Sequence, residues 1–139
     1  MKNIVLIFFL VLFFLGCKKE DENTQNSNFW KVKYEVTCSN PDTEVVLVYR
    51  DESGGVKQVG PTTGAGVTYV RLPWTYEANF SKDPGLSSNR VLTITVLFAQ
   101  PYNPIIDKLT VKIYVDGNVV NQTNSAVNGF GIGVTYVLL

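Results

Sequence analysis

Apolar and polar residues alternate with a period of two along most of the chain from Lys31 onward. In residues 31–37, KVKYEVT, three apolar side chains fall on one face and four polar or charged ones on the other. A period of two is typical of a β-strand buried on one face, because successive side chains point to opposite sides of the sheet. We therefore expect a strand here, with Val32, Tyr34 and Val36 pointing inward.

Six further segments carry a strand pattern. They are residues 43–50, 66–72, 75–80, 91–99, 108–115 and 132–139. The first, TEVVLVYR, is a nearly continuous apolar run, which is typical of a strand covered on both faces. Two of the others show a clear apolar face of four residues. These faces are Leu92, Ile94, Val96 and Phe98 in one segment and Leu109, Val111, Ile113 and Val115 in the next.

Turn-forming residues separate the segments at intervals of about eight to twelve residues. The sharpest signal is Asp116-Gly117, since both residue types tolerate the positive φ angles of a two-residue hairpin turn. After the N-terminal region, no window of a dozen residues shows a helical stripe. These patterns predict an all-β fold, an immunoglobulin-like antiparallel β-sandwich of about seven to nine strands, with a small barrel as the alternative.

The first residues break this pattern. After Lys2, residues 4–15 form an apolar run of about a dozen residues, the length of a secretory signal and shorter than the roughly 20 that span a bilayer. Leu15-Gly16-Cys17 then resembles the lipobox of bacterial lipoprotein signal peptides. The resemblance implies cleavage before Cys17 and attachment of lipid to the new N-terminal cysteine. An ordinary cleaved signal and a membrane helix are the alternatives, and in both Cys17 has no special role.

The segment that follows the cysteine, KKEDENTQNSN, contains no apolar side chain. Such a segment cannot bury enough surface to order itself, so we expect a flexible tether. The predicted organisation is a signal peptide at 1–16, the lipidated cysteine and its tether at 17–29, and one β-sandwich domain at 30–139.

Composition and charge narrow the function. The chain has 12 Lys and Arg against 12 Asp and Glu, so its net charge of zero does not indicate electrostatic binding of nucleic acid. The absence of histidine removes the most common general base and metal ligand, and every Ser-His-Asp or Cys-His arrangement. Because no catalytic, cofactor or metal motif is found, we expect a protein that is not an enzyme. Cys38 lies on the predicted face of Val36 and is interpreted as a buried small residue rather than a reactive thiol.

Two short stretches hold candidate contact residues for a ligand or partner. LPWTYEANF carries Trp74 and Tyr76, and FAQPYNPIID carries Tyr102. Exposed aromatic side chains at strand ends or on loops can bind sugars or peptides. Such residues more often anchor a core, and we favour the core for Trp74.

Two other groups of residues are assigned local roles. The acidic residues lie in or beside turns, where carboxylates cap backbone amides. They are Asp51, Glu52, Asp83, Asp107 and Asp116. The glycines of NGFGIGV, at 129, 131 and 133, predict a flexible hairpin or a bulge before the last strand.

Five short motifs resemble, in order, the small mycobacterial membrane protein (MmpS) family and its lipoprotein-anchored relatives in other bacteria. They are KYEVT, VYRDESGG, LPW, FAQ and VKIYVDGNVV, within residues 31–125. The resemblance implies a small extracytoplasmic β-sandwich that acts as an accessory partner of resistance-nodulation-division (RND) exporters of lipids or siderophores. The chain departs from the family in two ways. It has Cys17 in place of a transmembrane helix, and Lys112 and an aliphatic C-terminus where members often carry a cysteine pair.

The expected function is that of a membrane-anchored lipoprotein of the bacterial cell envelope, a non-enzymatic module that contacts another envelope protein or an exporter component. The alternative is a surface-exposed module that binds glycans or peptides through Trp74, Tyr76 and Tyr102. The sequence KED at 19–21 resembles a signal that some bacteria use to send lipoproteins to the cell surface. We therefore expect the outer membrane, with the domain on either its periplasmic or its outer face.

Overall fold

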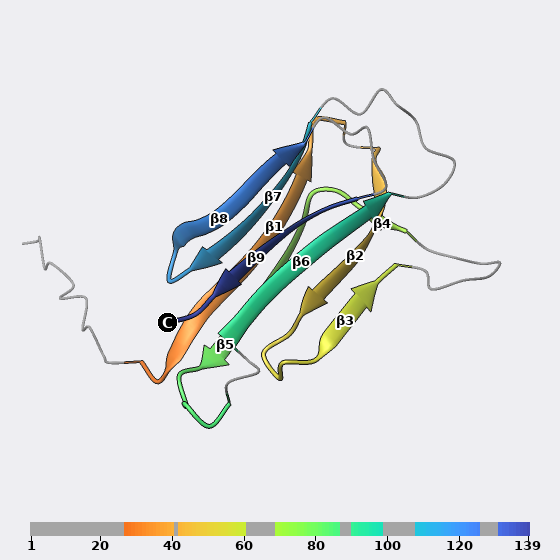
Figure 1. Ribbon diagram of the computed structural model, residues 1–139. Helices are drawn as coiled ribbons and strands as arrows, with labels where there is room; N and C mark the ends of the chain where they lie inside the picture. Colours follow the sequence, from red (N-terminus) through yellow and green to blue (C-terminus); the bar gives the residue numbers. More distant parts are fainter. Residues whose placement is uncertain (1–26, 41, 61–68, 87–89, 99–107, 126–130) are drawn as a thin grey trace, which may run out of the picture.

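The computed structural model describes residues 27–40, 42–60, 69–86, 90–98, 108–125 and 131–139. Within these residues the chain forms nine strands in two antiparallel sheets that pack face to face (Figure 1). The strands are β1 (Phe29–Cys38), β2 (Glu44–Arg50), β3 (Val56–Val59), β4 (Val70–Arg71), β5 (Trp74–Ser81), β6 (Val91–Phe98), β7 (Leu109–Val115), β8 (Asn118–Ser125) and β9 (Gly131–Val137). This architecture confirms the predicted all-β sandwich. No helix long and apolar enough to cross a bilayer occurs in the described ranges.

The strand order is β5-β1-β7-β8 in the four-stranded sheet and β3-β2-β6-β9 in the five-stranded sheet, where the short β4 also pairs with β2. The chain crosses between the sheets from β1 to β2 and again from β5 to β6. In one sheet β1 pairs with β5, and in the other β2 pairs with β6. Strands B, C, E and F of immunoglobulin domains are connected in this way. The β7–β8 hairpin differs, because it lies beside β1 where those domains place strand A.

The core lies between the sheets and consists of the inward positions of the alternating strands. Its largest fully buried side chains are Tyr34, Phe80, Leu47, Leu92, Ile94, Leu109 and Ile113. Burial of each such aliphatic side chain contributes about 1.5–3 kcal/mol to folding. The inward faces predicted for 31–37, 91–99 and 108–115 are confirmed, with Phe98 and Val115 half-buried.

The strand boundaries differ from expectation mainly at the edges of the sheets. Of the predicted strand at 66–72, only Val70–Arg71 is a strand, and 66–68 lie outside the described residues. The edge strand β3 was not expected, because its first three residues are exposed and VKQV has no apolar face that would reveal it. The hairpin predicted at Asp116-Gly117 is confirmed, since these residues join β7 to β8 with φ angles of 49° and 82°.

One end of the sandwich gathers the start of β1, the turn after β5, the start of β6 and the end of β9. The Lys82 amide donates to the Asn28 carbonyl at 2.8 Å, and the Leu138 amide donates to the Arg90 carbonyl at 2.7 Å. We call this the N-terminal end, and it lies at the lower left of Figure 1. The opposite end, where β1 and β6 finish, is called the far end.

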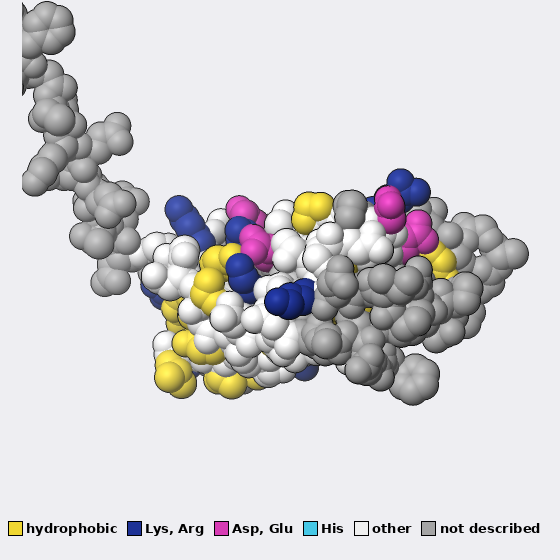
Figure 2. Space-filling view, turned by 90° about the horizontal axis from the view of Figure 1, so that it is seen from above, with side chains coloured by type: hydrophobic (Ala, Val, Ile, Leu, Met, Phe, Trp, Pro, Cys, Tyr) yellow, Lys and Arg dark blue, Asp and Glu magenta, His cyan; other side chains and the backbone are white. Residues whose placement is uncertain are grey.

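Charged residues are distributed differently over the two sheets, and in the five-stranded sheet they are confined to β2, β3 and β4. The outward positions of β1 and β7 include Lys33, Glu35 and Lys112 on the four-stranded sheet. In contrast, β6 and β9 of the five-stranded sheet contain no charged residue. Figure 2 shows charged side chains gathered mainly along the upper side of the molecule and hydrophobic ones at its left-hand end and lower edge. The sheet faces are therefore suited to different surroundings.

Gly131 and Gly133 lie within β9, in continuous register with β6, so the predicted hairpin or bulge is wrong at these positions. Gly129 lies outside the described residues. A Cβ on Gly131 would lie 2.5 Å from the Val96 carbonyl oxygen, and one on Gly133 would lie 2.9 Å from Thr95 Oγ1. These glycines are therefore needed because β6 approaches β9 too closely for a side chain.

Candidate functional site

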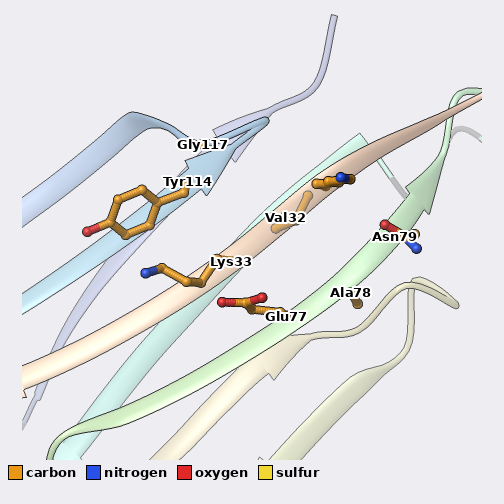
Figure 3. Close-up of a pocket in the computed structure, with 8 residues that line it drawn as sticks. Val32, Lys33, Glu77, Ala78, Asn79, Tyr114 and Gly117 are labelled. Atoms are coloured by element: carbon orange, nitrogen blue, oxygen red, sulfur yellow. The ribbon is translucent and has the colours of Figure 1, made fainter. Parts of the chain in front are cut away.

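A groove of about 500 Å³ crosses the outer face of the four-stranded sheet (Figure 3). Three neighbouring strands supply its polar side chains. They are Lys31 and Lys33 from β1, Glu77 and Asn79 from β5, and Tyr114 from β7. Lys33 is directly opposite Glu77 on one side and Tyr114 on the other, so these three form a row across the sheet. The groove is therefore built by strand register and not by a loop.

Glu35, two residues after Lys33 on β1, holds the neighbouring side chains in place. Its carboxylate accepts a hydrogen bond from the Tyr114 hydroxyl at 2.8 Å and one from the Lys33 ammonium at 3.0 Å. The Lys112 ammonium lies 3.5 Å away from it. The Lys33 ammonium also lies 4.3 Å from the centroid of the Tyr114 ring, a cation–π contact. These contacts fix Lys33 and Tyr114 along one wall of the groove.

The charges in this network stabilise one another. Partial burial of Glu35 acts to raise its pKa, but hydrogen bonds from Lys33 and Tyr114 and the nearby lysine charges outweigh it, so the pKa of Glu35 is lowered. The hydrogen bond to Glu35 raises the pKa of Lys33, against the smaller effect of desolvation. Both groups are therefore ionised at neutral pH and form a charged pair on the groove wall.

The remaining side chains of the groove are exposed and differ in charge. Lys31 offers a cation, Glu77 an anion and Asn79 an amide that can donate and accept. A mixed set of this kind matches a polar surface with both donors and acceptors, such as a peptide segment or a protein face. It gives no strong preference for a highly charged ligand.

Sequence reasoning missed this groove. The alternation assigned Lys33 and Lys112 to outward faces, but nothing in the sequence showed that β5 lies beside β1. The available signal was the set of lysine and acidic residues at successive outward positions in KVKYE, which contrasts with the uncharged outward positions of residues 91–98.

Trp74 and Tyr76, predicted as contact residues, point into the sandwich from β5. Their rings stack at 6° with centroids 6.4 Å apart. Both also contact Tyr49 of β2, at centroid distances of 5.3 Å and 4.7 Å. Both are half-buried and pack against the core. This position favours the core interpretation of Trp74 over a flat platform for sugars or peptides.

Tyr34 also contacts Tyr49 and Tyr76, and the hydroxyl groups of Tyr34 and Tyr76 are engaged within the fold. Tyr76 donates to the Glu52 carboxylate, and Tyr34 donates to the Arg50 carbonyl at 3.0 Å. Burial, followed by the Glu52 carboxylate, raises the pKa of Tyr76. Burial also raises the pKa of Tyr34, which has no exposed surface. Both phenols are therefore held neutral as structural donors.

The other predicted site residues lie apart from the groove or outside the described chain. Cys17 and Tyr102 lie outside the described residues. Cys38 is a free thiol that is half-buried against the core, and the Thr43 hydroxyl lies 3.3 Å from its sulfur. This environment is that of a small packed residue.

Three of the acidic residues predicted beside turns accept backbone hydrogen bonds. The pairs are Asp51 with Gly55 (3.0 Å), Asp83 with Gly85 (2.8 Å) and Asp116 with Lys31 (2.9 Å). Glu52 instead bonds Tyr76, and Asp107 lies outside the described residues. In the part of the chain that the structure describes, no three acidic, cysteine or histidine residues cluster as metal ligands would.

Comparison of the chain with protein-family models and with curated proteins finds no match. The MmpS resemblance therefore rests on the five short motifs alone and stays a prediction.

Proposed function

We propose that this protein is a lipid-anchored, non-enzymatic module of the bacterial cell envelope that contacts another envelope component through the groove of the four-stranded sheet. The lipobox-like ending at Cys17 supports the anchor, because two or three acyl chains bind a membrane stably where one does not. The polar segment at 18–28 supports a tether between anchor and domain. The narrower proposal, supported by the MmpS resemblance, is that the partner belongs to an RND exporter.

The groove is the observation that carries the contact role. Lys33 and Tyr114 are fixed by Glu35 at 3.0 Å and 2.8 Å, so little side-chain entropy is lost when a partner covers them. Lys31 and Glu77 are exposed beside them and can pair with opposite charges on a partner. A preorganised wall next to adaptable charges is suited to specific recognition of a polar surface.

The anchor is tested by comparing the full-length protein with a Cys17→Ala variant. Cells are fractionated, and protease is added to intact cells to test surface exposure. We expect the native protein in the membrane fraction and the variant released or unprocessed. Digestion of the native protein on intact cells would indicate the outer surface, and protection would indicate the periplasmic face. Identical fractionation of the two forms would show that Cys17 is not the anchor.

The contact role is tested by cross-linking in intact cells followed by capture of the tagged protein. A charge exchange in the groove, Lys31→Glu with Glu77→Lys, keeps the net charge constant. The matched control is the exchange Glu44→Arg with Arg71→Glu, at an exposed ion pair of 3.6 Å on the other sheet. We expect the envelope partner to be lost with the groove exchange and kept with the control. A partner that survives the groove exchange, or no partner at all, would overturn the proposal.

A further inference from the structure

The N-terminal end of the sandwich carries large hydrophobic side chains in solvent. Phe29 is 47% exposed, Leu86 43% and Val137 50%. They come from the start of β1, the turn after β5 and the end of β9. Figure 2 shows hydrophobic side chains gathered at the left-hand end of the molecule, which is the N-terminal end. Exposed apolar groups concentrated at one end of a domain commonly mark an interaction surface.

Backbone contacts bring these three side chains to one end. Phe29 pairs with Ser81 in the last register position of β1 and β5. Leu86 belongs to the turn that follows, where its amide donates to the Asp83 carbonyl at 3.1 Å. Val137 pairs with Val91 at the start of β6. Phe29, on the outer face of the four-stranded sheet, and Val137, on the outer face of the five-stranded sheet, therefore flank this end from opposite sides, with Leu86 in the turn.

Trp30 lies at this end as well, half-buried against the core and flanked by two cations. The Lys82 ammonium is 5.8 Å and the Arg90 guanidinium 6.0 Å from the centroid of its ring. Tryptophan next to long cationic side chains is typical of membrane–water interfaces, where the ring sits at headgroup level and the charges extend to water or phosphate. Lys31, Asp83 and Asp116 lie at the same end, so three cations there face two anions and the charges nearly balance.

We propose that the N-terminal end of the sandwich rests on a lipid bilayer, with Phe29 and Leu86 in the headgroup region and Trp30 just above them. This inference rests on the proposed function, because it takes Cys17 to be the membrane anchor. Residues 18–28 can span at most about 40 Å between Cys17 and Phe29. The anchor therefore keeps this end close to the bilayer, where the high effective concentration makes even a weak apolar contact populated.

This orientation leaves the proposed contact surface accessible. The groove begins at Lys31, two residues after Phe29 on the same outer face of the four-stranded sheet, so it opens beside the bilayer surface and not against it. The far end points away from the membrane, toward other envelope components. Because the charges at the N-terminal end nearly balance, we expect docking to depend on apolar burial and to change little with anionic lipid or salt.

The two tryptophans of the chain provide the test and its internal control. The full-length protein is produced in bacteria, purified from membranes and reconstituted into phosphatidylcholine vesicles with brominated acyl chains. Trp74→Phe leaves Trp30 as the reporter at the N-terminal end, and Trp30→Phe leaves Trp74 as the reporter at the opposite end of the β1–β5 pairing. Both rings are half-buried against the core, so the comparison tests position along the sandwich. We expect the lipid bromines to quench Trp30 several times more strongly than Trp74. Equal, weak quenching of both would overturn the inference.

A pair of leucine variants tests which side chains make the contact. Leu86→Ser removes an exposed side chain at the N-terminal end, and Leu97→Ser removes one of similar exposure (40%) on the outer face of β6, near the far end. We expect Leu86→Ser to reduce quenching of Trp30 and Leu97→Ser to leave it unchanged. Circular dichroism before reconstitution ensures that both variants are folded.

Flotation of the vesicles separates the two proposals. If the protein floats with the vesicles and Trp30 is quenched in both plain and anionic vesicles, the inference is supported. If it floats but Trp30 is not quenched, the anchor stands and the docking of the N-terminal end is wrong. If the native protein and Cys17→Ala both fail to float, the anchor is wrong, and the inference that rests on it falls as well.

Discussion

Glu35 accepts hydrogen bonds from Lys33 and Tyr114 on the outer face of the four-stranded sheet, so its ionisation should contribute to the stability of the fold. The lowered pKa means that the carboxylate is favoured in the folded state. Glu35→Gln should lower the free energy of unfolding by about 1 kcal/mol at neutral pH, a modest value because the network is partly solvated. Urea unfolding of both proteins gives this difference.

The same variant should show a defined pH dependence. Because the folded pKa of Glu35 is below the unfolded one, its contribution is present at neutral pH and is lost as the pH falls through the folded pKa. The stability gap between native protein and Glu35→Gln should therefore shrink as the pH falls below the unfolded pKa of roughly 4.3 and toward the lower folded pKa. Glu77→Gln, in the same groove but exposed, is the control and should change stability by less than about 0.5 kcal/mol. A gap for Glu35→Gln that does not vary with pH would contradict the assignment.

For Tyr34 and Tyr76 we expect the opposite pH dependence, a loss of stability at alkaline pH. Their pKa values are raised in the fold, mainly by burial. Their contribution to stability is therefore complete below the unfolded pKa of roughly 10 and is lost as the pH rises above it. The free energy of unfolding of the native protein should fall above about pH 10, and less steeply for Tyr34→Phe with Tyr76→Phe. Equal slopes for the two proteins would show that these phenols do not stay neutral in the fold.

At the residue scale, the sequence predicted which side of a strand is buried, but not which residues touch one another across the two sheets. Alternation placed Tyr34 and Val36 in the core because a strand has only two faces, and one of them is buried. It could not show that Trp74 stacks on Tyr76 and against Tyr49, because Tyr49 comes from the other sheet. The choice between a core and a platform role for Trp74 depended on that contact.

At the element scale, two glycines are needed for different physical reasons, and substitution can separate them. Gly117 has a φ of 82° and no atom within 4 Å of a Cβ, so only its backbone conformation resists a side chain. Gly131 lies in a strand, but a Cβ there would meet the Val96 carbonyl oxygen. Gly117→Ala should cost about 1 kcal/mol, and Gly117→Asn less, because asparagine tolerates positive φ.

Gly131→Ala should cost about 1–3 kcal/mol through overpacking, and Gly131→Asn should be no better tolerated. Thr135→Ala, on the same outward face of β9, is the control and should cost less than Gly131→Ala. Thermal and urea unfolding of the five variants give the order. If asparagine rescued position 131 as well as position 117, the steric reason given for Gly131 would be wrong.

The strands that the sequence predicted are those with a buried face. The segments 31–37 and 108–115 became β1 and β7 because their apolar residues must face the core. The edge strand β3 has a weaker requirement, since Val56, Lys57 and Gln58 are exposed and only Val59 packs against the core. Pairing of β1 with β5 could not be predicted either, because it depends on chain crossings and not on local pattern. The groove therefore stayed hidden although its residues were assigned to outward faces.

At the scale of the whole molecule, the two sheet faces and the two ends have separate roles in the proposals. The charged face of the four-stranded sheet carries the groove, while the apolar side chains Phe29 and Leu86 are at the end closest to Cys17 in the chain. The predicted tether allows the domain to use both surfaces at once, because it fixes the distance to the bilayer but not the rotation of the domain.

Limited proteolysis should distinguish the predicted tether from the folded domain. If Cys17 is the anchor, as proposed, trypsin added to the membrane-bound protein should cut first after Lys18 or Lys19, because the segment 18–28 has no apolar side chain that could pack. Lys33 and Lys112 should resist, since their backbone is paired within the four-stranded sheet. Mass spectrometry should find a soluble fragment that begins at residue 19 or 20.

The released fragment then tests how anchor and docking surface cooperate. In the proposed arrangement, a fragment without the lipid loses the high local concentration that an anchored tether gives, so it should bind fresh vesicles much more weakly than the intact protein. A fragment that bound as tightly as the intact protein would mean that Phe29 and its neighbours suffice as an anchor. A first cut within β1 or β7 would contradict the predicted organisation of one tether and one folded domain, because it would place the least protected backbone inside the sandwich.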